Sequence, residues 1–295
     1  MPIAFRYTTT EPQGMVSFGF DQHKVVSYLL GIARWSFSYG STDHHVRQVK
    51  LSLAGSVPAP GTVAATITAV LEDASGHDMD LSDSLITVCC IALLDSPESN
   101  LVLATGTGIP DGGSAGPFTL PGSSLAVGAF LAGFDLEYPP PDPPEPPDHN
   151  VRRFFAAAGF TENTNDQGFI TAQAGMCDDS GNQANDPQIA GALIAAASSE
   201  SSLLAVSGLR AQSEAPVEVD FGTPISDALV LLQGLNVEYN NDDHHVETLG
   251  GGTSGWKIDG TKVRLLDAYA FMQDASGHKQ DDGTSGVSML ILALP

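Results

Sequence analysis

Histidine and aspartate residues gather on two short motifs, each of which occurs three times in the chain. The first motif reads DHHV, DHNV and DHHV and occupies residues 43–46, 148–151 and 243–246, at spacings of 105 and 95 residues. The second reads DASGH, DDSGN and DASGH and occupies residues 73–77, 178–182 and 274–278, which lie 30, 30 and 31 residues after the first. Seven of the eight histidines lie on these motifs. Imidazole and carboxylate groups at this density could bind a transition metal or form a hydrogen-bonded network.

Two positions change together between the copies. His45 and His77 become asparagine in the second copy and return as histidine in the third, so we expect the two positions to be neighbours in space. A transition-metal site would use His45, His77, Asp43 and Asp73, or His245, His278, Asp243 and Asp274. His44 and His45 would not reach one ion from a strand, because successive strand residues point to opposite faces. The alternative is hydrogen bonding alone, since asparagine offers a donor and an acceptor as imidazole does.

Acidic residues after the second motif form another candidate cation site. Oxygen-rich loops suit calcium, although the spacing here differs from that of an EF-hand and is also typical of a solvated loop. The residues concerned are Asp73, Asp78, Asp80, Asp274 and Asp281. We expect no bound cofactor, and keep calcium and a transition metal as alternatives. The candidate ligand contacts are Trp256, Asp43, His45, His77, Asp148, Asn150, Asn182, Asp243, His245 and His278.

The residues around the motifs predict antiparallel β-structure. An alternating apolar stretch that ends in tyrosine precedes each DH motif, at residues 35–39, 133–138 and 234–239. A second apolar stretch follows each DxSG, at residues 85–94, 189–197 and 287–294. DxSG itself suits a tight turn, because Asp and Ser can bond the local backbone and Gly adopts a positive φ at no steric cost. Each copy is therefore expected to be a hairpin-rich β-module, and the fold class to be all-β.

The repeat divides the chain into three tandem antiparallel β-sandwich modules, at residues 1–98, 99–200 and 201–295. A module of about 100 residues is a normal size for a β-sandwich with its own core. Three such modules could pack around a pseudo-threefold axis, as a homotrimer would, or follow one another like beads. The second copy carries a proline-rich insertion at residues 139–147, which predicts a stiff loop: either a ligand for a proline-binding domain or a rigid surface tip.

One segment resembles a known family. Residues 217–239, VEVDFGTPISDALVLLQGLNVEY, resemble the opening of the H-type lectin module, where an aromatic residue and a proline precede a strand with a Gly-Leu pair. The resemblance implies a six-stranded antiparallel β-sandwich that assembles as a trimer, binds galactose-type sugars near subunit interfaces and is not an enzyme. The family's tryptophan before the turn is replaced by Leu71, Met176 and Met272, so that stacking platform is absent.

Composition excludes several classes of partner and activity. The chain has 35 acidic and 12 basic residues, a net charge of −23, which disfavours nucleic acid and anionic membrane surfaces. Its longest apolar runs have about half of the roughly 20 residues that a membrane helix needs, so we expect no membrane insertion. GGSAG at residues 112–116 matches a nucleophile elbow only formally, within a glycine-rich stretch, and no HExxH or CxxC occurs. The three cysteines read as small buried hydrophobes, not a disulfide framework.

These observations predict a non-enzymatic surface or attachment protein that binds glycans at module interfaces or loop ends. Trp256 would stack on a sugar, whereas Trp35 lies in an alternating strand and is expected in the core. The N-terminus has no features of a signal peptide, and a virion or an extracellular surface is the favoured location. The alternative is a structural component of a virion, such as a phage tail, spike or capsid part, or of an appendage. Both functions predict a homo-oligomer or a larger assembly; a lectin needs a polar groove with an aromatic wall, and a structural part needs broad apolar patches.

Overall fold

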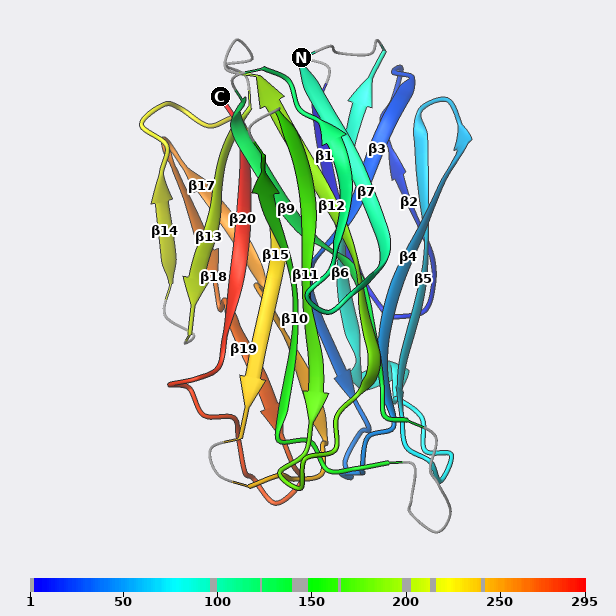
Figure 1. Ribbon diagram of the computed structural model, residues 1–295. Helices are drawn as coiled ribbons and strands as arrows, with labels where there is room; N and C mark the ends of the chain where they lie inside the picture. Colours follow the sequence, from blue (N-terminus) through cyan, green and yellow to red (C-terminus); the bar gives the residue numbers. More distant parts are fainter. Residues whose placement is uncertain are drawn as a thin grey trace.

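The computed structural model consists almost entirely of antiparallel β-sheet, which confirms the predicted all-β fold class (Figure 1). It describes residues 3–95, 100–122, 124–139, 148–163, 166–197, 203–212, 216–239 and 242–295. Both predicted module boundaries, and residues 140–147 of the proline-rich insertion, lie outside these ranges. Across the ranges that are described, no helix has the length and apolar character needed to cross a membrane.

We group the strands by the three copies that the sequence defines. The first copy contributes β1 (Ile3–Thr10), β2 (Gly14–Gly19), β3 (Val25–Ser38), β4 (Gln48–Ala59), β5 (Thr62–Glu72), the 3-10 turn η1 (Leu81–Asp83) and β6 (Leu85–Leu94). The second contributes β7 (Leu101–Pro110), β8 (Ser114–Thr119), β9 (Ser124–Glu137), β10 (Arg153–Glu162), β11 (Gln167–Cys177) and β12 (Asn185–Ala197). The third contributes β13 (Leu204–Ala211), β14 (Val217–Asp220), β15 (Asp227–Glu238), β16 (Thr248–Gly252), β17 (Gly255–Asp259), β18 (Lys262–Leu266), β19 (Tyr269–Gln273) and β20 (Gly286–Leu294).

Each of the three large sheets combines strands from two copies. Their strand orders are β1-β6-β3-β16-β19, β2-β5-β4-β9-β12-β7 and β13-β20-β15-β10-β11-β8. The junctions are the antiparallel pairs β3–β16, β4–β9 and β10–β15. Backbone hydrogen bonds therefore cross both predicted module boundaries, so the copies share sheets and are not strung out as separate beads.

The strands of one copy lie in two different sheets and pack face to face. In the first copy β3 contacts β4 and β5 across the layers, in the second β9 and β12 contact β10 and β11, and in the third β15 contacts β16 and β19. Each copy thus has a sandwich arrangement, while its two halves continue into the sheets of the other copies. This agrees with the sandwich architecture predicted from the sequence.

Two apolar cores hold the sheets together. One includes Trp35, which is fully buried, as predicted, and whose ring centroid lies 5.0 Å from that of Phe134 and 5.7 Å from that of Phe154. The other, which we call the shared core, includes Phe130, and both cores draw residues from all three copies. Cys89 and Cys90 lie in different cores, as expected for successive strand residues, and Cys177 is half-buried.

The third copy departs from the other two after its DH motif. Its hairpin is interrupted, so that β16 and β19 stay in a large sheet while β17 and β18 join β14 in a separate three-stranded sheet. Gly252 has φ +123° and Asp267 has φ +46° at the two bends. The buried hydroxyl of Thr253 donates to the carbonyl of Leu266 at 2.6 Å, which ties the bent strands together.

Candidate functional site

The three DH motifs lie side by side at one end of the molecule, opposite the end where β20 finishes (Figure 1). Each motif makes a short antiparallel bridge to each of the other two. The bridges are His44–Val246, Val46–His149 and Val151–His244. Every bridge carries two backbone hydrogen bonds, with lengths from 2.9 to 3.3 Å. The three copies are therefore joined here by a closed ring of backbone hydrogen bonds.

The aspartate of each DH motif connects its copy to a neighbouring copy. One carboxylate oxygen accepts a backbone N–H from the DxSG turn of another copy. These bonds run from Ala275 to Asp43 (3.2 Å), from Ala74 to Asp148 (3.1 Å) and from Asp179 to Asp243 (3.2 Å). The other oxygen faces the third residue of a neighbouring DH motif, at His245–Asp43 (3.6 Å), His45–Asp148 (3.7 Å) and Asn150–Asp243 (3.0 Å). The aspartates predicted to bind a ligand, and the residues that face them, thus connect the copies to one another.

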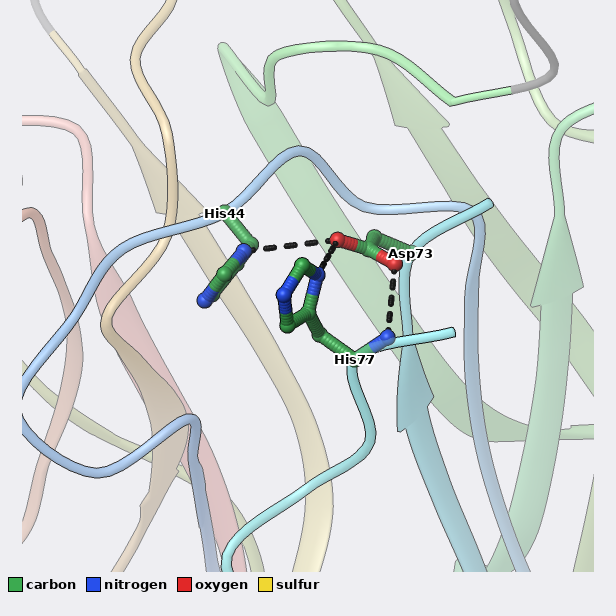
Figure 2. Close-up of side chains that lie close together, drawn as sticks. All are labelled: His44, Asp73 and His77. Atoms are coloured by element: carbon green, nitrogen blue, oxygen red, sulfur yellow. Dashed lines mark hydrogen bonds and ion pairs between the residues drawn. The ribbon is translucent and has the colours of Figure 1, made fainter. Parts of the chain in front are cut away.

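A second cluster forms inside the first copy, around Asp73 (Figure 2). The Oδ2 atom of Asp73 lies 2.6 Å from Nδ1 of His77 and 3.3 Å from Nδ1 of His44, and the two imidazole rings are 4.0 Å apart. Its Oδ1 atom accepts the backbone N–H groups of Ser75 and His77, at 2.7 and 2.9 Å. Gly76 has φ +89°, so the predicted turn chemistry of DxSG is confirmed.

The third copy repeats this cluster and the second copy alters it. Asp274 Oδ2 lies 2.7 Å from Nδ1 of His278 and 3.3 Å from Nδ1 of His244. In the second copy Asn182 takes the place of the second histidine. Its amide donates to Asp178 at 2.5 Å and lies 3.2 Å from Nδ1 of His149, which faces Asp178 at 3.4 Å.

The hydrogen bonds keep the central carboxylates ionised. Burial opposes the charge of Asp73, but the backbone and side-chain hydrogen bonds from His77 outweigh it, and the pKa of Asp73 lies below its ordinary value. The pKa of Asp274 is lowered in the same way, against burial, by the hydrogen bonds from His278. Both side chains are only 4% exposed, so each cluster holds a buried negative charge beneath imidazoles that reach the surface.

The structure groups these residues differently from the prediction. His45 faces Asp148 and the ring of His245, at 4.5 Å between centroids, whereas His44 joins Asp73 and His77. Over the described residues no hydrogen bond, ion pair or ring contact links His45 to His77; the two segments are linked through Asp148, which faces His45 and accepts the backbone N–H of Ala74 in the turn that contains His77. The two adjacent histidines point apart, as predicted, but His44, and not the predicted His45, belongs to the cluster around Asp73.

His44, His149 and His244 are the site residues that the sequence reasoning missed. One signal in the sequence could have found them. Each is histidine in all three copies, like its partner aspartate, whereas the following residue varies. Each also lies against the buried tyrosine that ends the preceding strand, with ring centroids 4.9, 4.7 and 4.7 Å apart at Tyr39, Tyr138 and Tyr239.

The predicted acidic calcium set is not brought together. Asp78 is exposed and pairs with Glu72 in an isolated bridge, Asp80 caps η1 through Ser82, and Asp281 accepts from the backbone N–H of Gly283. Within the described ranges, the groups of three or more potential ligands are His44, Asp73 and His77, and His244, Asp274 and His278. Asp73 and Asp274 are therefore placed with histidines and not with the other acidic residues.

Trp256 lies far from the motifs. Its indole N–H donates to the carbonyl of Ala228 at 3.0 Å, near the start of β15, whereas the DH motif follows the other end of that strand. Its ring centroid is 4.5 Å from that of Tyr7, and the side chain is partly buried against the apolar cores. The structure thus gives Trp256 a packing role and leaves only part of the ring exposed.

A groove of about 330 Å³ crosses the outer face of the sheet shared by the second and third copies. Its polar and aromatic lining comes from Arg153, Phe155, Gln173, Arg210 and Asn236. These residues lie on four strands of this sheet, β10, β11, β13 and β15. A second hollow of about 750 Å³ continues from it and shares Ala157, Gln173, Arg210 and Ser288. We call this combined surface the sheet groove.

Aromatic and cationic groups in the sheet groove are held in place. The guanidinium of Arg153 lies 4.7 Å from the centroid of Phe155, and its Nε donates to Asn236 at 2.7 Å. Asn236 donates in turn to the carbonyl of Thr284 at 2.8 Å. Arg210 is exposed and, among the described residues, makes no ion pair. The sheet groove therefore combines an ordered pair, Arg153 and Asn236, with the guanidinium of Arg210, which has no acidic partner within the described ranges.

The corresponding positions in the first copy have different chemistry. Counted from the DH motif, Gln48 and Lys50 stand where the second copy has Arg153 and Phe155. Lys50 is there paired with Asp135, at 2.6 Å, and Gln48 donates to the same carboxylate at 2.7 Å. At these positions the first copy thus has neither an aromatic side chain nor, over the described residues, an unpaired cation.

No protein-family model matches this chain, and no curated protein matches it significantly in sequence.

Proposed function

We propose that the protein is a non-enzymatic attachment protein that binds glycans, and that the sheet groove is its sugar site. The observation that carries the proposal is the convergence of Phe155, Arg210 and the amides of Gln173 and Asn236 on one groove. A glycan-binding protein needs this combination of a polar groove and an aromatic wall. The position between two copies also fits the H-type lectin resemblance, which implies sugar sites near subunit interfaces.

Each lining group suits one part of a sugar. The half-buried ring of Phe155 can cover the apolar face of a pyranose, while the amides can exchange hydrogen bonds with its hydroxyls. Arg210 presents a guanidinium fork, which binds a carboxylate in two parallel hydrogen bonds. In a chain with net charge −23, an exposed arginine that has no acidic partner among the described residues favours an acidic sugar over a neutral one.

A glycan array tests this proposal. We expect the purified protein to bind glycans with a terminal carboxylated sugar, and Phe155→Ala and Arg210→Ala each to reduce that binding at least tenfold. Lys50→Ala, at the corresponding position of the first copy, is the matched control and should bind as the unchanged protein does. No binding across the array, or binding that neither groove variant alters, would contradict the proposal. A parallel array in chelator should give the same result, because the sheet groove has no cation ligand set.

A structural role in a larger assembly is the second candidate, and one surface favours it. A mostly apolar hollow of about 480 Å³ lies between β3, β4 and β7, lined by Val26, Tyr28, Leu53, Val57 and Leu103 among others. Val26 and Val57 are 39% and 42% exposed. Such a surface fits an apolar partner. If assembly is the function, the unchanged protein should form oligomers, and Val57→Glu should lower the mass that light scattering measures. A monomeric mass for both the unchanged protein and the variant would contradict a role in assembly.

A further inference from the structure

The histidine clusters of the first and third copies have the donors of a metal site. In each, two imidazole nitrogens and one carboxylate oxygen all lie within 4.8 Å of one another. The sets are His44, Asp73 and His77, and His244, Asp274 and His278. Two imidazoles and one carboxylate with an open fourth position form a ligand set that zinc uses in proteins.

The spacing of the donors is close to what such an ion needs. Ligands about 2.1 Å from a tetrahedral ion are about 3.4 Å from one another. The distance from His44 Nδ1 to Asp73 Oδ2 is already 3.3 Å, and that from His244 Nδ1 to Asp274 Oδ2 is also 3.3 Å. The second histidine in each cluster, at 2.6 or 2.7 Å, must move away by less than about 1 Å. It is more than half exposed, so it is free to make that movement.

Surrounding groups orient the donors, as in established metal sites. In the first copy, the two backbone N–H groups on Asp73 Oδ1 fix the carboxylate and leave Oδ2 facing the imidazoles. Nε2 of His44 lies 3.1 Å from the hydroxyl of Thr42, which holds Nδ1 toward Asp73. In the third copy the backbone N–H of His278 holds Asp274 Oδ1 at 2.8 Å.

The second copy has the same arrangement around its aspartate but lacks the second histidine, which would bind the metal. There the side-chain amide nitrogen of Asn182 donates to Asp178, and an amide nitrogen has no lone pair to offer a metal. The arrangement is retained around His149 and Asp178, so asparagine at this position is compatible with the fold. The chain thus carries its own natural control for the role of the second histidine.

We propose that the chain binds two divalent transition-metal ions such as Zn²⁺, one in the cluster of His44, Asp73 and His77 and one in the cluster of His244, Asp274 and His278. Solvent completes the coordination of each ion. The corresponding position in the second copy binds none. The stoichiometry is therefore two ions per chain, not one or three.

Isothermal titration of the chelator-treated full chain with zinc chloride at pH 7.5 tests this proposal. We expect two ions per chain for the unchanged protein, one for His77→Asn, and none at the same concentrations for the double variant His77→Asn with His278→Asn. The asparagine variants copy the second cluster and should fold, which circular dichroism can verify. His23→Asn is the matched control, because His23 pairs with Asp95 outside the clusters, and it should keep two ions.

The opposite substitution provides a gain-of-function test. Asn182→His should raise the stoichiometry from two to three. No zinc binding by the unchanged protein, or the same stoichiometry in the double asparagine variant, would overturn the proposal and leave the clusters as hydrogen-bonded supports of the turns. Because the sheet groove contains none of these residues, the glycan array can fail without affecting this result.

Discussion

Asp227, at the start of β15, keeps a carboxylate in a partly buried position. Burial raises its pKa, and the opposing backbone hydrogen bond from Ala228 and the charge of Arg6 do not cancel the effect. A carboxyl group whose pKa is raised in the folded state disfavours folding once the pH exceeds that pKa. We therefore expect Asp227→Asn to raise the melting temperature by a few degrees at pH 7. The gain should disappear near pH 4, where the native carboxyl takes up its proton.

Asp220 provides the matched control for Asp227. It is exposed, and the backbone N–H of Gly222 lowers its pKa. Asp220→Asn should therefore not raise the melting temperature at pH 7. Thermal unfolding followed by circular dichroism at the two pH values would measure both variants. If both variants raised the melting temperature equally, the cause would be the change in net charge. That result would contradict the explanation by burial.

At the residue level, the sequence predicted the types of the site residues better than their grouping. The DxSG turns and the buried position of Trp35 follow from local rules of hydrogen bonding and strand alternation. Whether His44 or His45 reaches Asp73 depends on the orientation of the short DH segment. Its bridges to the other two copies set that orientation. The sheet groove was not predicted, because Phe155 and Arg210 are 55 residues apart and come to one surface only through the successive pairing of β10, β15, β20 and β13.

Among the strands, β3 meets the equivalent strands of both other copies at Gly31. A Cβ atom built there would lie 2.6 Å from the ring of Phe130 on β9 and 2.7 Å from Leu231 on β15. Added volume in a well-packed core forces neighbours out of their positions and costs about 1–3 kcal/mol. Gly31→Ala should therefore lower the free energy of unfolding by about that amount. Urea denaturation would measure the loss.

Gly122→Ala is the control for Gly31→Ala. A Cβ at Gly122 meets no atom within 4 Å, so this change should alter the free energy of unfolding by less than about 0.5 kcal/mol. If Gly31→Ala were equally harmless, the three strands would not be packed as closely as the structure places them.

Strand positions were largely predictable, and strand partners were not. The apolar stretch at residues 85–94 coincides with β6, and the stretch after Gly286 coincides with β20. These follow from local composition. The pairs β3–β16, β4–β9 and β10–β15 join residues far apart in sequence, and nothing in the local pattern of a strand specifies which distant edge it will pair with.

The whole molecule should unfold as one unit. Three sheets cross from copy to copy, and the shared core takes side chains from all of them, including Leu29, Phe130, Leu231 and Leu290. Removing one copy would expose this core and leave strand edges unpaired. We expect a single calorimetric transition whose measured enthalpy equals the van't Hoff enthalpy. Separate transitions, or a stably folded fragment of residues 100–197, would contradict this expectation.

A crystal structure of the protein with an acidic glycan would show whether the sheet groove binds it, as we propose. We expect a pyranose ring against Phe155 with its carboxylate on Arg210, and the same ligand absent from crystals of Arg210→Ala. A sugar bound instead at Trp256, or at the end of the molecule that carries the DH motifs, with the sheet groove empty, would contradict it.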